Sequence, residues 1–237
     1  MRLLISFASI LACTLPVHAQ ITVALKPSLG GSAELKIRND GPVALAAYVI
    51  AGRQIMGMTK GEMYWPFKKY ADSLVDMTAP LASSQERTVM RSGPRSVLEP
   101  AFVSAGIFAD GTTTGDAALI TDLMLRRSSM LLAVETALET LSTAGRHNMP
   151  RSLVIQQFRT FADLAKRWYL TPEQQAGWPL YDSVLFKLIN LPDRPATSAF
   201  PPTGFVDQEG ALLTRRRNAL EESRPPLEDM TPGPVRK

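Results

Sequence analysis

Residues 33–51 read AELKIRNDGPVALAAYVIA, and this stretch decides the fold class. In its first part, apolar Ala33, Leu35 and Ile37 alternate with charged residues, which is the period of two expected of a half-buried β-strand. The Asn-Asp-Gly-Pro run at 39–42 is typical of a turn. Residues 43–51 are then apolar at both parities, which predicts a central strand covered on both faces, with Gly52 ending it.

Similar signals lie on both sides of this stretch. Ile21, Val23 and Leu25 alternate with small or polar residues. Further short strands are predicted at 73–77, 86–91 and 101–108, and prolines and glycines separate them. Roughly six or seven short strands over about ninety residues favour an antiparallel two-sheet β-sandwich at 20–112.

The order of strand, Asn-Asp-Gly-Pro turn and strand resembles the immunoglobulin-like or fibronectin-type-III-like domains common in exported bacterial proteins. The resemblance covers residues 20 to 110 and implies an Ig-like sandwich, although the Cys and Trp hallmarks of antibody domains are absent. Residues 105–116 also resemble a feature of uncharacterised exported bacterial proteins that pass from a β-domain into a helix. This second likeness implies a fold and no activity.

Beyond residue 115 the apolar residues recur every three or four positions, which predicts helices. Asp116 is expected to cap a first helix of about 28 residues that Gly145 closes, and Arg127 is the one polar interruption of its apolar face. A second helix is predicted at 150–169, and the short connection before it indicates an antiparallel hairpin.

A capping box at Thr171 and Gln174 precedes a third predicted helix at 180–191. Residues 113–191 therefore form a helical hairpin or small bundle. The following region, 192–237, is rich in proline and is expected to be extended or partly disordered, with one short helix at 207–223.

Three consecutive arginines, Arg215, Arg216 and Arg217, occupy nearly all sides of that short helix. This arrangement favours a helix surrounded by solvent. The alternative is an electrostatic contact with anionic lipid or cell-wall polymer.

The chain opens with a three-part pattern of one cation, an apolar run at 3–12, and small residues Val17 and Ala19 before Gln20. This is the plan of a secretory signal peptide, and the run is shorter than the ~20 residues that a membrane-spanning helix needs. We expect residues 1–19 to be removed by cleavage between Ala19 and Gln20, and the protein to be periplasmic or secreted. In the alternative, residues 10–13 act as a bacterial lipobox and Cys13 carries a lipid anchor.

Composition excludes several classes of function. The single cysteine of the 237 residues, Cys13, lies in the leader, so the mature chain has no disulfide, thiolate nucleophile or cysteine metal site. The net charge of +4 is modest, and we expect no nucleic acid partner. Because no later stretch reaches ~18 apolar residues, no transmembrane helix is expected after leader removal.

Catalytic motifs are also missing from the sequence. His147 is the only histidine beyond the leader, and neither a Gly-x-Ser-x-Gly elbow nor a Ser-x-x-Lys pair occurs. We therefore assign no catalytic residue, metal ligand or cofactor, and place His147 in a surface connection between helices. A polar loop between Asp110 and Asp116 offers oxygen ligands for calcium, but a strand-to-helix turn capped by Asp116 explains both acids.

The most suggestive segment for binding is a dense aromatic and basic run in a predicted connection between strands. It consists of Tyr64, Trp65, Phe67, Lys68, Lys69 and Tyr70. Aromatic residues on a loop can stack on sugar rings or anchor in a partner's pocket, and the two lysines add charge. The alternative is that Trp65 and Phe67 fold back onto the sandwich or the helices.

The sequence thus predicts an exported α+β protein with a β-sandwich, a helical region and a Pro-rich tail. We expect a non-catalytic binding or scaffolding role in the cell envelope or extracellular space, with an envelope protein or polymer as partner. One alternative is a hydrolase that acts on cell-wall or extracellular polymer through acidic residues that the sequence does not identify. Another is a self-associating structural protein.

Overall fold

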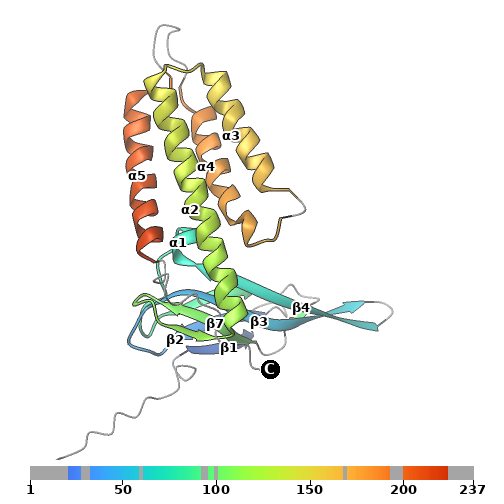
Figure 1. Cartoon of the computed structure of the whole chain (residues 1–237). Helices are drawn as coiled ribbons and strands as arrows, with labels where there is room; N and C mark the ends of the chain where they lie inside the picture. The colour runs from blue at the N-terminus through green and yellow to red at the C-terminus, as the bar shows by residue number, and fades with distance from the viewer. Residues whose placement is uncertain are drawn as a thin grey trace, which may run out of the picture.

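The computed structural model describes residues 21–27, 33–58, 61–91, 96–98, 101–167, 170–192 and 200–223, and shows an α+β fold (Figure 1). The predicted leader, its cleavage site and Cys13 lie outside the described residues. The elements in chain order are β1 (Ile21–Pro27), β2 (Ala33–Asn39), β3 (Leu45–Met58), β4 (Gly61–Asp72), α1 (Ser73–Asp76), β5 (Glu86–Arg91), β6 (Ser96–Leu98), β7 (Phe102–Phe108), β8 (Thr113–Gly115), α2 (Ala117–Arg146), α3 (Arg151–Ala165), the 3-10 helix η3 (Gln174–Gly177), α4 (Trp178–Ile189) and α5 (Thr203–Glu222).

The strands form two antiparallel sheets, with the orders β1-β2-β5 and β4-β3-β7-β8, and β6 pairs with β3 beyond the end of β7. Apolar side chains of both sheets share one core, in which Leu35 and Ile37 of β2 meet Tyr48 and Ile50 of β3. The predicted antiparallel β-structure of the first half of the chain is confirmed.

Strand β3 is covered on both faces, as its uninterrupted apolar run predicts. Tyr48 and Ile50 contribute to the core between the sheets, whereas Ala47 and Val49 belong to a second core with Leu119 and other residues of α2. Alternate residues of a strand point to opposite faces, so a run without polar positions suits this middle layer. The first turns of α2 therefore lie on the sheet (Figure 1).

Two local predictions are wrong. Gly52 does not end its strand, because β3 continues to Met58. A Cβ at Gly52 would lie 2.8 Å from both the Ala101 Cβ and the Phe67 ring, so glycine is required there for close packing. The predicted strand at 73–77 is instead the short helix α1, which Asp72 caps and which Met77 ends in the left-handed region with φ 55°.

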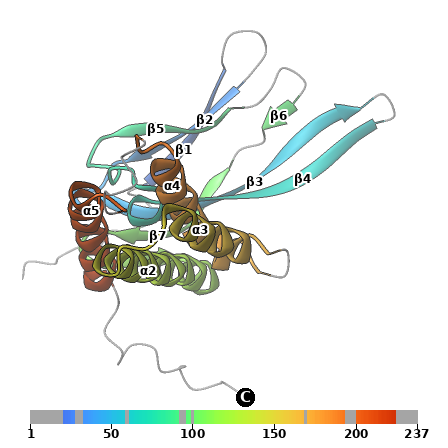
Figure 2. The ribbon, with the colours of Figure 1, turned by 90° about the horizontal axis from the view of Figure 1, so that it is seen from above.

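The predicted connection that carries the aromatic and basic run is also a strand. Residues 61–72 form β4, which pairs along its whole length with β3, and the two strands project past the helices as a long ribbon (Figure 2). Among the described residues, β4 is the last strand of its sheet. Pro66 is tolerated there because an edge strand needs fewer ladder hydrogen bonds.

The helices α2, α3 and α4 confirm the three predicted helical segments. Asp116 caps α2 by accepting hydrogen bonds from the amides of Ala118 and Leu119, and His147 ends that helix at the surface. The predicted capping box also forms, since Thr171 and Gln174 each bond the other's backbone amide before η3. The expected pairing is different, however: α2 packs mainly against α5 and η3, and α3 packs against α4.

The last helix differs most from its prediction. α5 is 20 residues long, and it buries Leu213 and Leu220 in the core shared by the helices rather than lying in solvent. Glu209 of α5 is buried and bonds Lys187 of α4 through both oxygens, at 2.8 and 2.7 Å. The helix is thus the fourth long member of the bundle, and a leucine spacing of seven residues supplies its inner face. No helix within the described ranges has both the length and the apolar character of a membrane span.

Candidate functional site

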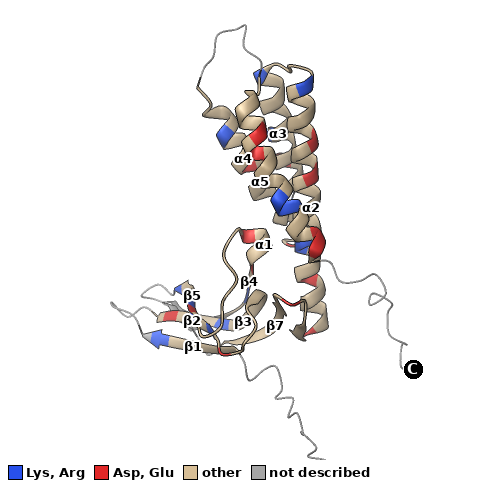
Figure 3. Cartoon of the chain, turned by 90° about the vertical axis from the view of Figure 1, so that its left-hand side faces the viewer, with Lys and Arg blue, Asp and Glu red and all other residues tan. Residues whose placement is uncertain are grey.

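The helix α1 lies between the sheets and the helical bundle, and the charged residues around it form the junction of the two layers (Figure 3). Asp72 at its start has a fully buried side chain, and its Oδ1 accepts from the amide of Leu74 at 3.0 Å. Arg127 of α2 donates to both oxygens of Asp72, from Nε at 2.7 Å and from Nη2 at 3.3 Å. This buried ion pair joins the β-domain to the bundle.

A second arginine, Arg216, joins α1 to the last helix. Its Nε donates to the carbonyl of Leu74 and its Nη2 to the carbonyl of Val75. These carbonyls belong to a helix of one turn, which has too few residues to satisfy them internally. Burial lowers the pKa of Arg216, and the nearby charges of Asp76 and Asp72 oppose that effect.

The third arginine, Arg126, is held without any hydrogen bond to the residues that the structure describes. Its Nη2 lies 3.5 Å from Oδ1 of Asp76, and its guanidinium lies over the Tyr70 ring at 5.4 Å from the centroid. Only 14% of the side chain is exposed, and its buried Nε has no partner. Arginine carries five N–H donors, and the donors on the two Nη atoms of Arg126 also make no hydrogen bond to a described residue. These Nη donors, rather than the inaccessible Nε, are available for a ligand or for water.

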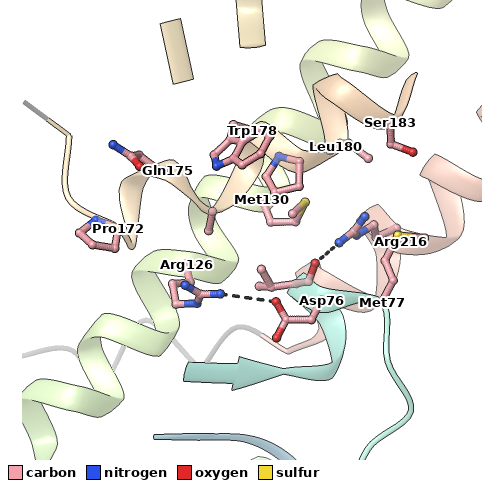
Figure 4. A pocket seen from close by; sticks show the side chains of 13 residues that line it. Asp76, Met77, Arg126, Met130, Pro172, Gln175, Trp178, Leu180, Ser183 and Arg216 are labelled. Atoms are coloured by element: carbon pink, nitrogen blue, oxygen red, sulfur yellow. Dashed lines mark hydrogen bonds and ion pairs between the residues drawn. The ribbon is translucent and has the colours of Figure 1, made fainter. Parts of the chain in front are cut away.

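Two hollows meet at Arg126 and Asp76, and together they form the waist site. The first, of about 500 Å³, lies between α1 and the helices, and Arg126 and Arg216 reach it from α2 and α5 (Figure 4). Trp178, Met130 and Leu180 give it apolar walls. The second, of about 460 Å³, lies on the side of the sheets and is lined by polar and aromatic side chains that include Tyr48, Lys69, Tyr70 and Arg87.

The waist site is positively charged. The cationic side chains that line its two hollows are Lys69, Arg87, Arg126 and Arg216, whereas Asp76 is the one acidic residue among the described residues that line them. Asp76 is itself engaged, because its Oδ2 accepts the amide hydrogen of Asp72 at 2.8 Å. The arrangement suits an anion, because opposite charge and guanidinium donors favour carboxylate or phosphate oxygens.

The structure divides the sequence-predicted binding run between different surfaces. Lys69 and Tyr70 line the waist site, and Lys68 is exposed. Trp65 is 48% exposed on the ribbon, whereas Phe67 packs against the core between the sheets. The side chain of Tyr64 lies outside the described residues. A binding role for this run stays a prediction.

Tyr70 is tied to α2 as well as to the sheet. Its hydroxyl donates to Oδ2 of Asp122 at 3.0 Å. Burial, and then the hydrogen bond to Asp122 and the negative charge of that carboxylate, raise the pKa of Tyr70 well above its ordinary value. The phenol therefore stays neutral and presents a fixed ring face to Arg126.

The acids that bracket the polar loop at 110–116 have local structural roles. Oδ1 of Asp110 accepts from the amide and the hydroxyl of Thr112, at 3.0 and 2.7 Å, and these bonds lower the pKa of Asp110. Asp116 caps α2, as predicted. The described residues contain no cluster of three or more His, Cys, Asp or Glu side chains that could hold a metal ion.

Another hollow, of about 750 Å³, lies between β1 and the β7–β8 pair. Its walls are mostly apolar, with Ile21, Val23 and Phe102 among them. Asp116 is the one charged side chain among the described residues that line this hollow, and its Oδ1 already accepts the amide hydrogen of Ala118 as the N-cap of α2. The waist site is therefore the better candidate.

Sequence reasoning missed Asp72, Asp76, Arg126 and Arg216 as site residues. One signal was present, because Arg127 interrupts the apolar face of its helix and a buried arginine requires a partner. Its partner lies 55 residues earlier in the chain, in a segment predicted as a loop followed by a strand.

Comparisons of the chain with models of known protein families, with curated proteins and with solved structures found no match.

Proposed function

We propose that this protein is an exported, non-catalytic binding or scaffolding protein of the cell envelope or extracellular space, and that it binds an anionic ligand at the waist site. One observation carries the proposal: Arg126 is largely buried at the meeting point of two hollows and makes no hydrogen bond to any described residue. Leaving buried donors unpaired costs about 1–3 kcal/mol, or more when the group is charged. A bound anion would remove that cost.

The leader pattern and the resemblance to domains common in exported proteins both support the exported role. The leader pattern at 1–19 is that of a signal peptide, with the lipid anchor at Cys13 as the alternative. The proposed kinship with Ig-like or fibronectin-III-like domains is supported by the strand orders β1-β2-β5 and β4-β3-β7-β8. If β1, β2 and β5 are matched to strands A, B and E, then β3, β7 and β8 take the places of C, F and G, and β4 takes the additional place beside C.

The hydrolase alternative requires an acid that is free to give or take a proton. Asp76 is the acid that lines the waist site among the described residues, and Asp72, Asp122 and Glu173 lie beside residues that line it. Asp122 accepts the hydroxyl hydrogen of Tyr70. Asp72 is buried beneath Arg127, and Asp76 is hydrogen-bonded to the backbone beside Arg126. This geometry favours binding over acid–base chemistry.

The proposal is tested by affinity capture from envelope and culture fractions with the mature chain. Three variants accompany the parent: Arg126→Gln at the waist site, Trp65→Ala on the ribbon, and Arg159→Gln as a charge-matched control on the exposed face of α3. We expect a partner that the parent and Arg159→Gln capture and that Arg126→Gln loses while still folded.

Two outcomes count against the proposal. Loss with Trp65→Ala and retention with Arg126→Gln would move the contact surface to the ribbon. Equal capture by all four proteins would show that neither the waist site nor the ribbon binds the partner.

A further inference from the structure

We infer that the waist site takes a small organic carboxylate with an apolar body, which it holds by its acid group on Arg126 and by its body against Trp178, Met130 and Leu180. The inference rests on the proposed binding function and names the chemistry of the ligand. It follows from three properties of the site: the free donors, the net charge and the apolar wall.

The free donors belong to Arg126 rather than to its neighbours. Arg127 gives two hydrogen bonds to Asp72, and Arg216 gives two to the carbonyls of α1, so both are committed to the fold. Arg126 is held in place by Asp76 at 3.5 Å and by the ring of Tyr70, which orient the guanidinium without using its donors in hydrogen bonds. A planar guanidinium held in this way matches the two oxygens of a carboxylate.

The net charge of the first hollow favours one negative charge on the ligand. Arg126 and Arg216 carry positive charge into this hollow, and Asp76 carries the negative charge (Figure 4). The excess of one positive charge is neutralised by a monoanion. Lys69 and Arg87 line only the second hollow, so a phosphate dianion in the first hollow would exceed the charge there by one and place it near Asp76, and like charges at close range are unfavourable.

The apolar wall determines the chemical character of the part of the ligand beyond its acid group. Trp178, Met130 and Leu180 come from α4 and α2, and they face the same hollow as the two arginines. The indole of Trp178 is fixed by Lys166, whose Nζ lies 4.3 Å from the ring centroid. The volume of about 500 Å³ lies within the range of small-molecule sites, which combine apolar walls with a few placed polar groups.

The test follows the fluorescence of Trp178 in a Trp65→Phe/Trp168→Phe variant, in which it is the only one of the three tryptophans left. The probe is phenylacetate at fixed ionic strength, and its controls are acetate, phenylacetamide and phenyl phosphate. We expect saturable binding of phenylacetate, on the order of millimolar for so small a ligand, and binding at least roughly tenfold weaker for the three controls. Ligand-observed NMR with the parent chain repeats the comparison without the tryptophan substitutions.

The same titration with Arg126→Gln is expected to weaken phenylacetate binding by roughly tenfold to a hundredfold, because a charge-assisted pair is lost, and Arg159→Gln is expected to leave it unchanged. Equal binding of phenylacetate and phenylacetamide, tighter binding of phenyl phosphate, or no binding of phenylacetate would overturn the inference. If phenylacetate does not bind but Arg126→Gln still loses the captured partner, the proposed function stands and the small carboxylate is the wrong ligand. If phenylacetate does not bind and Arg126→Gln captures the partner as the parent does, the waist site is not a binding site.

Discussion

Replacing Asp72 by asparagine tests the junction between the sheets and the bundle most severely. The substitution keeps the shape of the side chain and an oxygen that can cap α1, so it isolates the charge from the cap. It leaves the guanidinium of Arg127 buried beside a neutral amide, since the side chains of Asp72 and Arg127 are 0% and 7% exposed. Removing one partner of such a pair costs about 3–5 kcal/mol.

That loss is large against the total free energy of unfolding of about 5–15 kcal/mol. With a urea m-value of roughly 2 kcal/mol/M, the midpoint of unfolding should fall by about 2 M. Urea unfolding followed by circular dichroism measures this shift. The double variant Asp72→Asn/Arg127→Met removes the stranded charge and should be more stable than Asp72→Asn, with a coupling of about 2 kcal/mol or more.

Two results would show that Asp72 and Arg127 do not form a stabilising buried pair. The first is a loss below about 1 kcal/mol for Asp72→Asn, which would mean that the pair is not buried as described. The second is strict additivity in the double variant, which would mean that Asp72 and Arg127 do not interact.

The remaining predictions concern packing, helix capping and pH. Gly177→Ala should destabilise the chain by about 1–3 kcal/mol, because the new Cβ would lie 2.8 Å from the Cβ of Ala133. Gly204→Ala should be nearly neutral or slightly stabilising, because no heavy atom lies within 4 Å of the new Cβ. Thermal unfolding of the two variants compares these effects. Asp116→Ala should cost about 1 kcal/mol through the lost α2 cap, and urea unfolding that shows no loss would contradict this assignment. Because burial raises the pKa of Tyr70 above its ordinary 10.0, the stability carried by its neutral phenol is intact below pH 10 and is lost as the pH rises toward the raised value. Urea midpoints measured above pH 10 should therefore fall more steeply for the parent than for Tyr70→Phe, and equal slopes would count against the assignment.

The sequence was informative wherever a local pattern determines structure. The alternation in β2, the apolar run of β3 and the caps at Asp116 and Thr171 depend on neighbouring residues, and each is found as predicted. The errors have a different cause. The local pattern predicts a strand end at Gly52, because sequence alone does not show that a glycine provides space for the distant residues Ala101 and Phe67.

The waist site also depends on residues that are far apart in the sequence. Its arginines come from β5, α2 and α5, and the groups that hold Arg126 and Arg216 lie in β4 and α1, so no short motif contains them. Three consecutive arginines that occupy nearly all sides of α5 predict a helix surrounded by solvent. In the structure Arg216 instead caps the carbonyls of α1, and a partner 141 residues away along the chain cannot be found from spacing.

Arg126 makes no hydrogen bond to a described residue and is proposed to bind an anion, whereas Arg127 gives its donors to Asp72. The most direct measurement is an NMR titration of the arginine guanidinium signals, Nη–Hη as well as Nε–Hε, with phenylacetate, assigned with the Arg126→Gln variant. We expect the Arg126 signals to shift downfield and saturate, and the signals of Arg127, whose Nε already donates to Asp72, to stay in place. A titration in which the Arg126 signals do not move, or in which those of Arg127 respond instead, would show that Arg126 does not bind the anion.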